Sequence, residues 1–213
     1  MSGQSWPHGA GTRGRIAAHL ARRPTREAAA EGRRRAAVAL VLLPGPGGAE
    51  TAFLLTRRAS RLARHAGQYA LPGGRLDPGE TALDAALREL DEELGIAAGP
   101  ADVLGRLDDL PTASGYLIAP FVLWLGQADT PRPDPAEVAA VHYVPLVELF
   151  TPPDAPMPRR IAPEPGALWL HLPTLGHEVY APTAAVLHQF REVALLGRDS
   201  AMPAFREPGF ARR

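Results

Sequence analysis

The segment ETALDAALRELDEEL at residues 80–94 constrains the fold of this chain more than any other. Its leucines recur at spacings of four, three and four residues, which is the spacing of one apolar helix face. They are Leu83, Leu87, Leu90 and Leu94. Thr81 with Asp84 resembles a capping pair, and Gly95 is a natural end for the helix. A narrow apolar face must be buried against another layer, so this helix predicts a layered core.

Apolar runs on both sides of this helix have the lengths of strands. They predict a hairpin of residues 33–43 and 51–58, later strands at 103–110, 116–126 and 139–146, a short helix at 147–150, a second hairpin within 167–182 and an amphipathic helix at 183–196. Strands with a few helices between them predict a single mixed α/β domain. A chain of 213 residues is long enough to bury its core.

The predicted domain covers residues 33–200, between an N-terminal extension at 1–32 and a C-terminal tail at 201–213. Within the extension, the Gly- and Ser-rich residues 1–12 predict disorder, and residues 13–31 predict a short helix interrupted near Pro24. The six-proline segment 151–166 predicts a loop.

Composition excludes several classes of protein. The chain has no Cys, which excludes disulfides and thiolate metal sites. It has no apolar run near the ~20 residues that span a bilayer and no signal-peptide pattern, which predicts a cytoplasmic protein. The formal net charge is zero, so the overall charge does not favour nucleic acid or membrane as a partner. The oligomeric state is not predicted.

Three glutamates, Glu89, Glu92 and Glu93, fall on one face of the predicted helix. Like charges this close repel one another and do not stabilise a helix. Carboxylate oxygens are the ligands that hard divalent cations such as Mg²⁺ prefer. The three residues alone leave two interpretations open, a metal site and an acidic surface facing solvent.

The surrounding spacing resembles a known motif. Gly74 is followed by five residues and Glu80, then by seven more and the run from Arg88 to Ile96, RELDEELGI. This resembles the Nudix box, GX5EX7REUXEEXGU with U aliphatic, at every defined position. The resemblance implies an α/β/α sandwich with a mixed sheet. It also implies hydrolysis of a nucleoside diphosphate linked to another moiety, with Mg²⁺ or Mn²⁺ as cofactor.

Carried over by position, the resemblance makes Glu89, Glu92 and Glu93 metal ligands, together with the backbone carbonyl of Gly73. It places Glu80 in the same acidic cluster and gives Arg88 the role of orienting a carboxylate through a charge-assisted hydrogen bond. Glu92 and Glu89 are the two candidates for the residue that accepts the proton. Glu137 is a more distant third candidate, and its position after Pro135 favours a capping role in a turn instead.

The residues just before the box narrow the expected substrate. LLTRRASRLARHAGQYALPGG at 54–74 resembles LLTxR[SA]…HxGxxxFPGG, the signature of the coenzyme A pyrophosphatase branch. That resemblance implies cleavage of coenzyme A or an acyl derivative to 3′,5′-ADP and a 4′-phosphopantetheine. The chain departs from the branch at Leu71, where Phe is usual, at Ala63, where Arg is expected, and at Tyr180-Ala181, where Trp-Gly is usual.

Basic residues offer candidate phosphate sites. Arg58, Arg61, Arg64 and His65, close to Gly67, form a basic loop that could hold the 3′-phosphate or the diphosphate of coenzyme A. A solvated Arg loop is the alternative, and His65 could equally be packed. The run Arg33–Arg35 could be a phosphate or nucleic-acid patch, but a solvated edge before the first strand is favoured.

Two other functions stay open at this point. One is a Nudix hydrolase of a different nucleoside diphosphate derivative, such as ADP-ribose or a dinucleoside polyphosphate. The other is a Nudix-fold module that binds a nucleotide without cleaving it. Because such a module would be expected to lose box carboxylates and this chain keeps all of them, the sequence favours a hydrolase.

Overall fold

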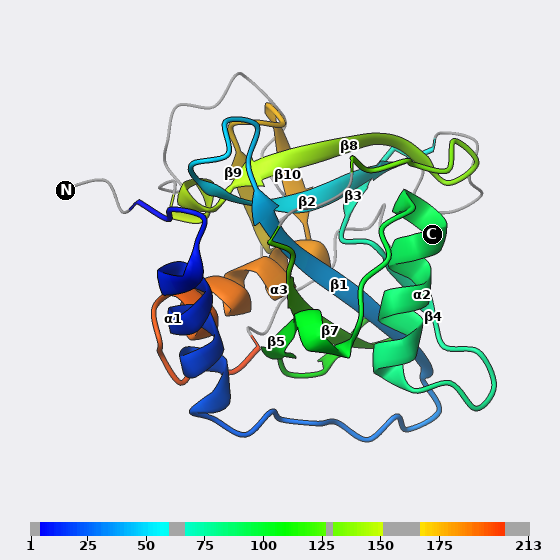
Figure 1. Ribbon diagram of the computed structural model, residues 1–213. Helices are drawn as coiled ribbons and strands as arrows, with labels where there is room; N and C mark the ends of the chain where they lie inside the picture. Colours follow the sequence, from blue (N-terminus) through cyan, green and yellow to red (C-terminus); the bar gives the residue numbers. More distant parts are fainter. Residues whose placement is uncertain (1–4, 60–66, 127–129, 151–166, 203–213) are drawn as a thin grey trace.

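The computed structural model describes residues 5–59, 67–126, 130–150 and 167–202 (Figure 1). Arg61, Arg64 and His65 lie outside the described residues, as do Ala63, the segment 151–166 and most of the predicted tail. The helices are α1 (Ala10–Ala21), α2 (Ala82–Leu94) and α3 (Thr183–Phe190), with the short helices η1 (Pro100–Asp102), η2 (Leu146–Phe150) and η3 (Arg191–Leu195). The strands are β1 (Arg34–Pro44), β2 (Thr51–Arg58), β3 (Tyr69–Ala70), β4 (Gly73–Arg75), β5 (Val103–Arg106), β6 (Leu110–Pro111), β7 (Tyr116–Trp124), β8 (Val138–Pro145), β9 (Trp169–Leu172) and β10 (His177–Tyr180).

A mixed eight-stranded sheet forms the centre of the molecule. Strand β1 runs parallel to β7, with Arg34 opposite Tyr116 and Leu42 opposite Trp124. On its other side β1 is antiparallel to β4 and then to β2. Strands β3 and β8 pair with β2, and β5 and β6 pair with β7. The predicted first hairpin is confirmed as β1–β2, and the predicted late hairpin is confirmed as the separate pair β9–β10.

Helices cover both faces of the sheet (Figure 1). Successive side chains of a strand point to opposite faces, and β1 follows this rule. Ala39 and Val41 join the core cluster under α2, whereas Leu40 joins a second cluster with Ile16 of α1 and Phe190 of α3. The predicted α/β/α sandwich with a mixed sheet is therefore confirmed.

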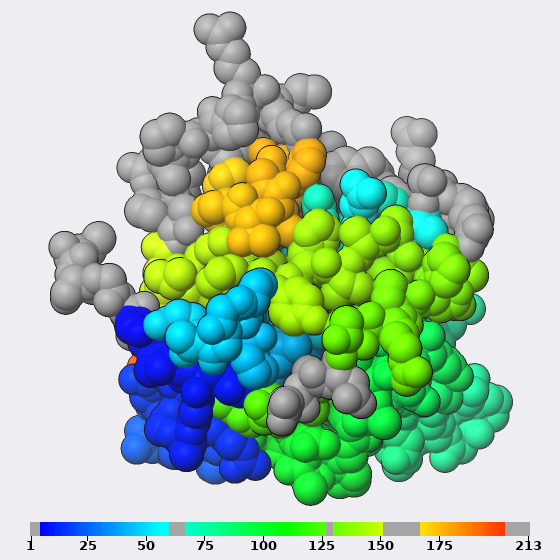
Figure 2. Space-filling view, turned by 45° about the horizontal axis from the view of Figure 1, so that its top comes forward, coloured from blue at the N-terminus to red at the C-terminus, as the bar shows by residue number. Residues whose placement is uncertain are grey.

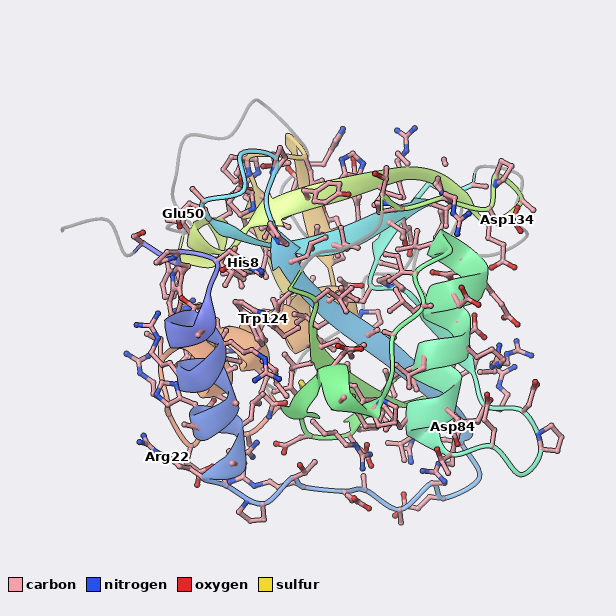
Figure 3. The ribbon with its side chains drawn as sticks, in the orientation of Figure 1. His8, Arg22, Glu50, Asp84, Trp124 and Asp134 are labelled. Carbon is pink, nitrogen blue, oxygen red and sulfur yellow. The ribbon has the colours of Figure 1, made fainter. Side chains whose placement is uncertain are left out.

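Helix α2 has the predicted ends. The hydroxyl of Thr81 accepts a hydrogen bond of 3.1 Å from the backbone N–H of Asp84. Gly95 ends the helix in the left-handed conformation, at φ 62°. Figure 3 labels Asp84 in the first turn and Asp134 beside the last turn, where the N–H of Asp134 donates to the carbonyl of Glu93 at 3.0 Å. Backbone groups are thus satisfied at both ends of the helix.

The buried face of α2 differs in part from the predicted leucine face. Leu90 and Leu94 are fully buried, but Leu83 and Leu87 are only partly buried. The sheet is contacted instead by small side chains in the first two turns and by one carboxyl group near the end. The remaining buried residues are Ala82, Ala85, Ala86 and Glu93. Small residues allow the helix to lie close to β1.

Two predicted elements are wrong in part. The strand predicted at 103–110 is broken into β5 and β6, because Asp108 and Asp109 turn away to accept backbone hydrogen bonds from Arg26 and Ala28. The helix predicted as amphipathic at 183–196 becomes α3 followed by the π-helical η3. Its residues are buried on nearly all sides, because α1 packs against η3 and the hairpin β9–β10 packs against α3.

The predicted disorder at 1–12 is wrong for the described residues from Ser5 onward. Trp6 is 1% exposed, and its ring stacks on Phe150 at 5.9 Å between centroids. His8 stacks on Trp124 at 4.3 Å (Figure 3). Helix α1 accordingly begins at Ala10, earlier than predicted, and ends before Pro24. Burial of these two aromatic rings anchors a segment that its Gly and Ser content had marked as disordered.

The space-filling view shows the hairpin β9–β10, in orange, beside the yellow-green residues of β8 and η2 (Figure 2). Within the described ranges, none of the helices combines the length and the apolar character needed to cross a bilayer.

Candidate active site

A cleft of about 790 Å³ opens at the ends of β1, β4 and β7, beside the last turns of α2 and the start of α3. Its floor is one face of the sheet. Arg34, Ala36 and Val38 alternate along β1 onto this face, and Tyr116 and Ile118 of β7 lie directly opposite Arg34 and Ala36. The cleft is large enough for a nucleotide-sized ligand.

Carboxylates gather at one end of the cleft, which we call the acidic end: Glu89, Glu92, Glu93 and Glu137. Glu93 is only 3% exposed, and its Oε2 has no hydrogen-bond partner among the described residues. Its Oε1 lies 3.7 Å from Nη1 of Arg58. Burial, with the nearby charges of Glu89 and Glu137, raises the pKa of Glu93 to about 8 even though Arg58 opposes the shift.

Glu89 and Glu92 are held differently from Glu93. Burial raises the pKa of Glu89, although the adjacent Arg88 guanidinium lowers it. The Glu92 side chain is 60% exposed. Arg88 contacts both, since its Nη1 donates to Oε1 of Glu89 at 3.0 Å and to Oε2 of Glu92 at 2.8 Å.

Arg88 also joins the helix to the loop before it. Its Nε and Nη2 donate to the two carboxylate oxygens of Glu80 at 2.9 and 3.1 Å, a bidentate pair. Its Nη2 donates as well to the carbonyl oxygen of Arg75 at 3.0 Å. The pKa of Glu80 is lowered mainly by this pair. Neither Glu80 nor Arg88 lines the cleft. Both therefore support the acidic end from outside the cleft.

Two glycines, Gly73 and Gly74, lie between α2 and the floor of the cleft. A β-carbon at Gly74 would overlap the carboxyl group of Glu89, and one at Gly73 would overlap the backbone of Ala37 and Val38. Gly73 also has a φ of 149°, which side-chain-bearing residues rarely adopt. Glycine at position 74 lets the Glu89 carboxyl group lie directly against β4, and glycine at position 73 lets β4 lie close to β1.

The acidic end has carboxylate oxygens of the kind that divalent cations prefer. Across the described ranges, no three acidic or histidine side chains converge as a ready-made metal cluster. Both Glu89 and Glu92 instead accept hydrogen bonds from Arg88. The donor set still fits, because Glu93 presents a buried carboxylate oxygen without a partner, and such an orphaned acceptor is costly unless a cation or a proton satisfies it.

The structure also describes three other residues considered in the sequence analysis, Arg58, Gly67 and Glu137. Arg58 lines the cleft but points to Glu93. Gly67 is exposed outside the cleft lining, and its N–H donates to the carbonyl of Arg58 at 3.1 Å. The capping role favoured for Glu137 is wrong, since Oδ1 of Asp134 accepts the turn hydrogen bond from Ala136 at 2.7 Å and the Glu137 side chain lines the cleft.

Two cleft residues, Arg75 and Tyr116, were not predicted from the sequence, and a third, Arg34, belongs to the run for which a solvated edge was favoured over a phosphate patch. The Arg34 guanidinium lies over the Tyr116 ring at 4.2 Å from its centroid, and Nε of Arg75 donates to the Tyr116 hydroxyl at 2.8 Å. Arg34 is exposed, as the solvated-edge interpretation expects, and it also lines the cleft. Strand alternation put Arg34 on the face of Ala36, but only the β1–β7 register brings Tyr116 beside it.

Comparisons with known proteins agree with this architecture. The crystal structure of a Nudix hydrolase from M. smegmatis, RenU, superposes with a TM-score of 0.52 at 22% identity, covering 83% of this chain and 91% of that one. The chain is 41% identical over 113 residues to the uncharacterized Nudix hydrolase NudL of Yersinia enterocolitica, and 44% identical over 120 residues to NudL of Yersinia pestis. These alignments cover 53% and 55% of this chain, and 58% of each relative's length.

The family model described as the NUDIX domain matches residues 33–164. This range contains β1, Gly73 and Gly74, all of α2 and Glu137, and so all four glutamates of the acidic end. The chain therefore belongs to the Nudix family.

Proposed function

We propose that this protein is a metal-dependent pyrophosphohydrolase that cleaves coenzyme A, or an acyl derivative, to 3′,5′-ADP and the corresponding 4′-phosphopantetheine. The observation that carries the hydrolytic part is the buried Glu93 carboxyl group, which has an unpartnered oxygen at the acidic end of a nucleotide-sized cleft. A carboxyl group arranged in this way is expensive to bury unless it meets a cation or holds a proton.

Glu89, Glu92 and Glu93 would hold Mg²⁺ or Mn²⁺, with the carbonyl of Gly73 as a further ligand. When bound, such an ion neutralises charge on a diphosphate and supplies a nucleophilic water near neutral pH. Arg88 keeps Glu89 oriented beside β4. Arg58, 3.7 Å from Glu93, lies where its guanidinium can also contact a diphosphate oxygen.

Glu89 is the stronger of the two candidates for accepting the proton from water. Burial raises its pKa, which moves it toward the range where a general base works best. Glu92 is largely exposed. Glu137, which lines the cleft, is the third candidate.

Coenzyme A as substrate is supported by the branch signature at residues 54–74. In the structure Leu54 and Leu55 of this segment are core residues, and Arg58 reaches the cleft. Leu71, the departure from the usual Phe, is 5% exposed and lines the cleft, so it still presents an apolar wall there.

The test is incubation of the purified chain with coenzyme A and Mg²⁺ or Mn²⁺, with the products resolved by mass. We expect 3′,5′-ADP and phosphopantetheine, and no products in the presence of EDTA. Glu89→Gln should lower kcat by at least about 100-fold. The matched control is Glu27→Gln, an exposed carboxylate outside the cleft that pairs with Arg106; it should keep wild-type turnover.

Other outcomes separate the alternatives. Cleavage of ADP-ribose or a dinucleoside polyphosphate while coenzyme A survives would support the proposal that the protein is a hydrolase and reject coenzyme A as its substrate. Nucleotide binding without cleavage of any of these compounds would reject the hydrolase in favour of a binding module.

A further inference from the structure

We propose that Arg34, Arg75 and Tyr116 form a second anion site in the cleft, which binds a phosphate monoester on the nucleoside part of the substrate. We call these three residues the arginine–tyrosine site. Its assignment to a substrate rests on the proposed hydrolysis, whereas its preference for a phosphate monoester rests on its own charges and contacts.

The three side chains hold one another in place. The Arg34 guanidinium covers the Tyr116 ring at 4.2 Å, a cation–π contact, and its Nη2 donates to the carbonyl oxygen of Ser114 at 3.3 Å. Nε of Arg75 donates to the Tyr116 hydroxyl at 2.8 Å. One tyrosine therefore positions two guanidinium groups, which come from different strands.

Both cations lack a carboxylate partner within the described part of the chain. The other arginine at the cleft, Arg58, lies against Glu93, and Arg88 behind it is bonded to three glutamates. Arg34 and Arg75 form no such ion pair with any described residue; Arg34 donates to the carbonyl oxygen of Ser114 and Arg75 to the hydroxyl of Tyr116. Two uncompensated guanidinium groups side by side are suited to a doubly charged phosphate, which can accept from both.

The distance between the acidic end and the arginine–tyrosine site also suits a nucleoside. Gly73 lies opposite Val38, Arg75 opposite Ala36, and Tyr116 opposite Arg34. At ~3.3 Å per residue, Arg34 is about 13 Å along β1 from Val38, and Arg75 is about 7 Å along β4 from Gly73. The floor between the two ends is apolar, made of Ala36, Val38 and Ile118. The acidic end, holding a divalent cation, would suit the diphosphate. The apolar floor would suit the nucleoside, and the arginine–tyrosine site would suit the separate phosphate.

The test is a binding measurement that needs no turnover. Titration calorimetry on the full chain in EDTA would compare adenosine 3′,5′-bisphosphate with adenosine 5′-monophosphate. We expect the wild type to bind the bisphosphate at least about tenfold more tightly, the effect of one or more charge-assisted hydrogen bonds. Arg34→Gln and Arg75→Gln should each remove most of that preference. Tyr116→Phe, which deletes the hydroxyl bonded to Arg75, should reduce it by a smaller factor.

The matched control is Arg35→Gln. It removes the same charge from the adjacent residue of β1, which points to the opposite face and does not line the cleft. This variant should keep the wild-type preference. Thermal denaturation of each variant would establish that it is folded.

Three results would overturn the proposal. The wild type could bind both nucleotides equally, or Arg35→Gln could reduce the preference as much as Arg34→Gln does. The arginine variants could also weaken both ligands by the same factor, which would indicate that the base stacks on the guanidinium. If the protein fails to cleave coenzyme A, the proposed function falls, but the binding comparison still decides this proposal.

Discussion

At the scale of single residues, Gly74 shows how an absent side chain shapes the cleft. A β-carbon there would overlap the Glu89 carboxyl group, which is the flexible end of its side chain and can move away. We therefore expect Gly74→Ala to leave the free energy of unfolding within about 1 kcal/mol of wild type while lowering kcat by at least about tenfold, because a small misplacement of a catalytic group is costly.

The control for this prediction is Gly99→Ala, at an extended residue where a β-carbon meets nothing within 4 Å. It should change neither quantity. Steady-state kinetics and urea denaturation of both variants check the pair. Full activity in Gly74→Ala would mean that Glu89 can act from a displaced position.

Arg88 is the second residue whose geometry matters more than its charge. Its planar group bonds to Glu80, Glu89 and Glu92 at once, and a lysine ammonium cannot reproduce that fork. We expect Arg88→Lys to lower kcat by about tenfold or more, since Glu89 and Glu92 lose their common donor. Arg106→Lys, in the ion pairs with Glu27 and Asp109 away from the cleft, should lower the melting temperature without lowering kcat. Equal kcat in the two variants would show that charge alone suffices at Arg88.

At the scale of elements, α2 depends on its N-cap. Thr81→Ala removes the hydroxyl that accepts from Asp84, and we expect it to cost about 1 kcal/mol of unfolding free energy. Asp91→Ala, at an exposed position in the last turn of the helix, should cost nothing, because alanine is the better helix former. Urea denaturation followed by circular dichroism measures both. An unchanged midpoint for Thr81→Ala would mean that packing alone fixes the start of the helix.

The elements also show where sequence reasoning succeeds and where it stops. Helix α2, the β1–β2 hairpin and the ends at Thr81 and Gly95 follow from local periodicity and capping, which are properties of neighbouring residues. The break between β5 and β6 depends on hydrogen bonds from a segment about 80 residues away, which local patterns do not encode.

The same limit applies to the candidate site. The acidic residues of α2 were found because a single helix carries them at fixed spacing. Arg34, Arg75 and Tyr116 come from three strands, and their proximity depends on the register of β1 with β4 and β7. Glu137 was misjudged because the turn hydrogen bond is accepted by Asp134, three residues earlier.

At the scale of the whole molecule, the buried carboxylate of Asp108 links the N-terminal extension and α3 to the connection between β5 and β6. Asp108 accepts from Nη2 of Arg23 at 2.9 Å, from the N–H of Arg26 at 2.9 Å and from Nε2 of Gln189 at 2.6 Å. Arg23 follows Arg22, labelled just past α1 in Figure 3, and Gln189 belongs to α3. Arg23 also donates to Asp199 at 3.1 Å. The N-terminal extension and α3 are thus held to the β5–β6 connection through a single side chain.

Because of this arrangement, the free energy of unfolding should fall as the pH is lowered. Burial raises the pKa of Asp108, but the hydrogen bonds from Arg23, Arg26 and Gln189 outweigh it and hold the pKa below the ordinary value of 3.8. The unfolded chain therefore binds a proton at a higher pH than the folded chain does. The stabilisation is complete above the unfolded pKa and is lost as the pH falls through the lower folded pKa.

We therefore expect Asp108→Asn to lower the free energy of unfolding by about 3 kcal/mol at pH 7, since it leaves the buried Arg23 without its main partner. The gap between variant and wild type should narrow as the pH is lowered below about 4, because the unfolded wild-type chain binds a proton at Asp108 before the folded chain does. Asp199→Asn, in a side chain that is 69% exposed, should cost less than about 1 kcal/mol at either pH. Urea denaturation from pH 7 to pH 3 measures all three proteins. A gap that stays constant over this range would show that Asp108 acts through the shape of its hydrogen bonds and not through its charge.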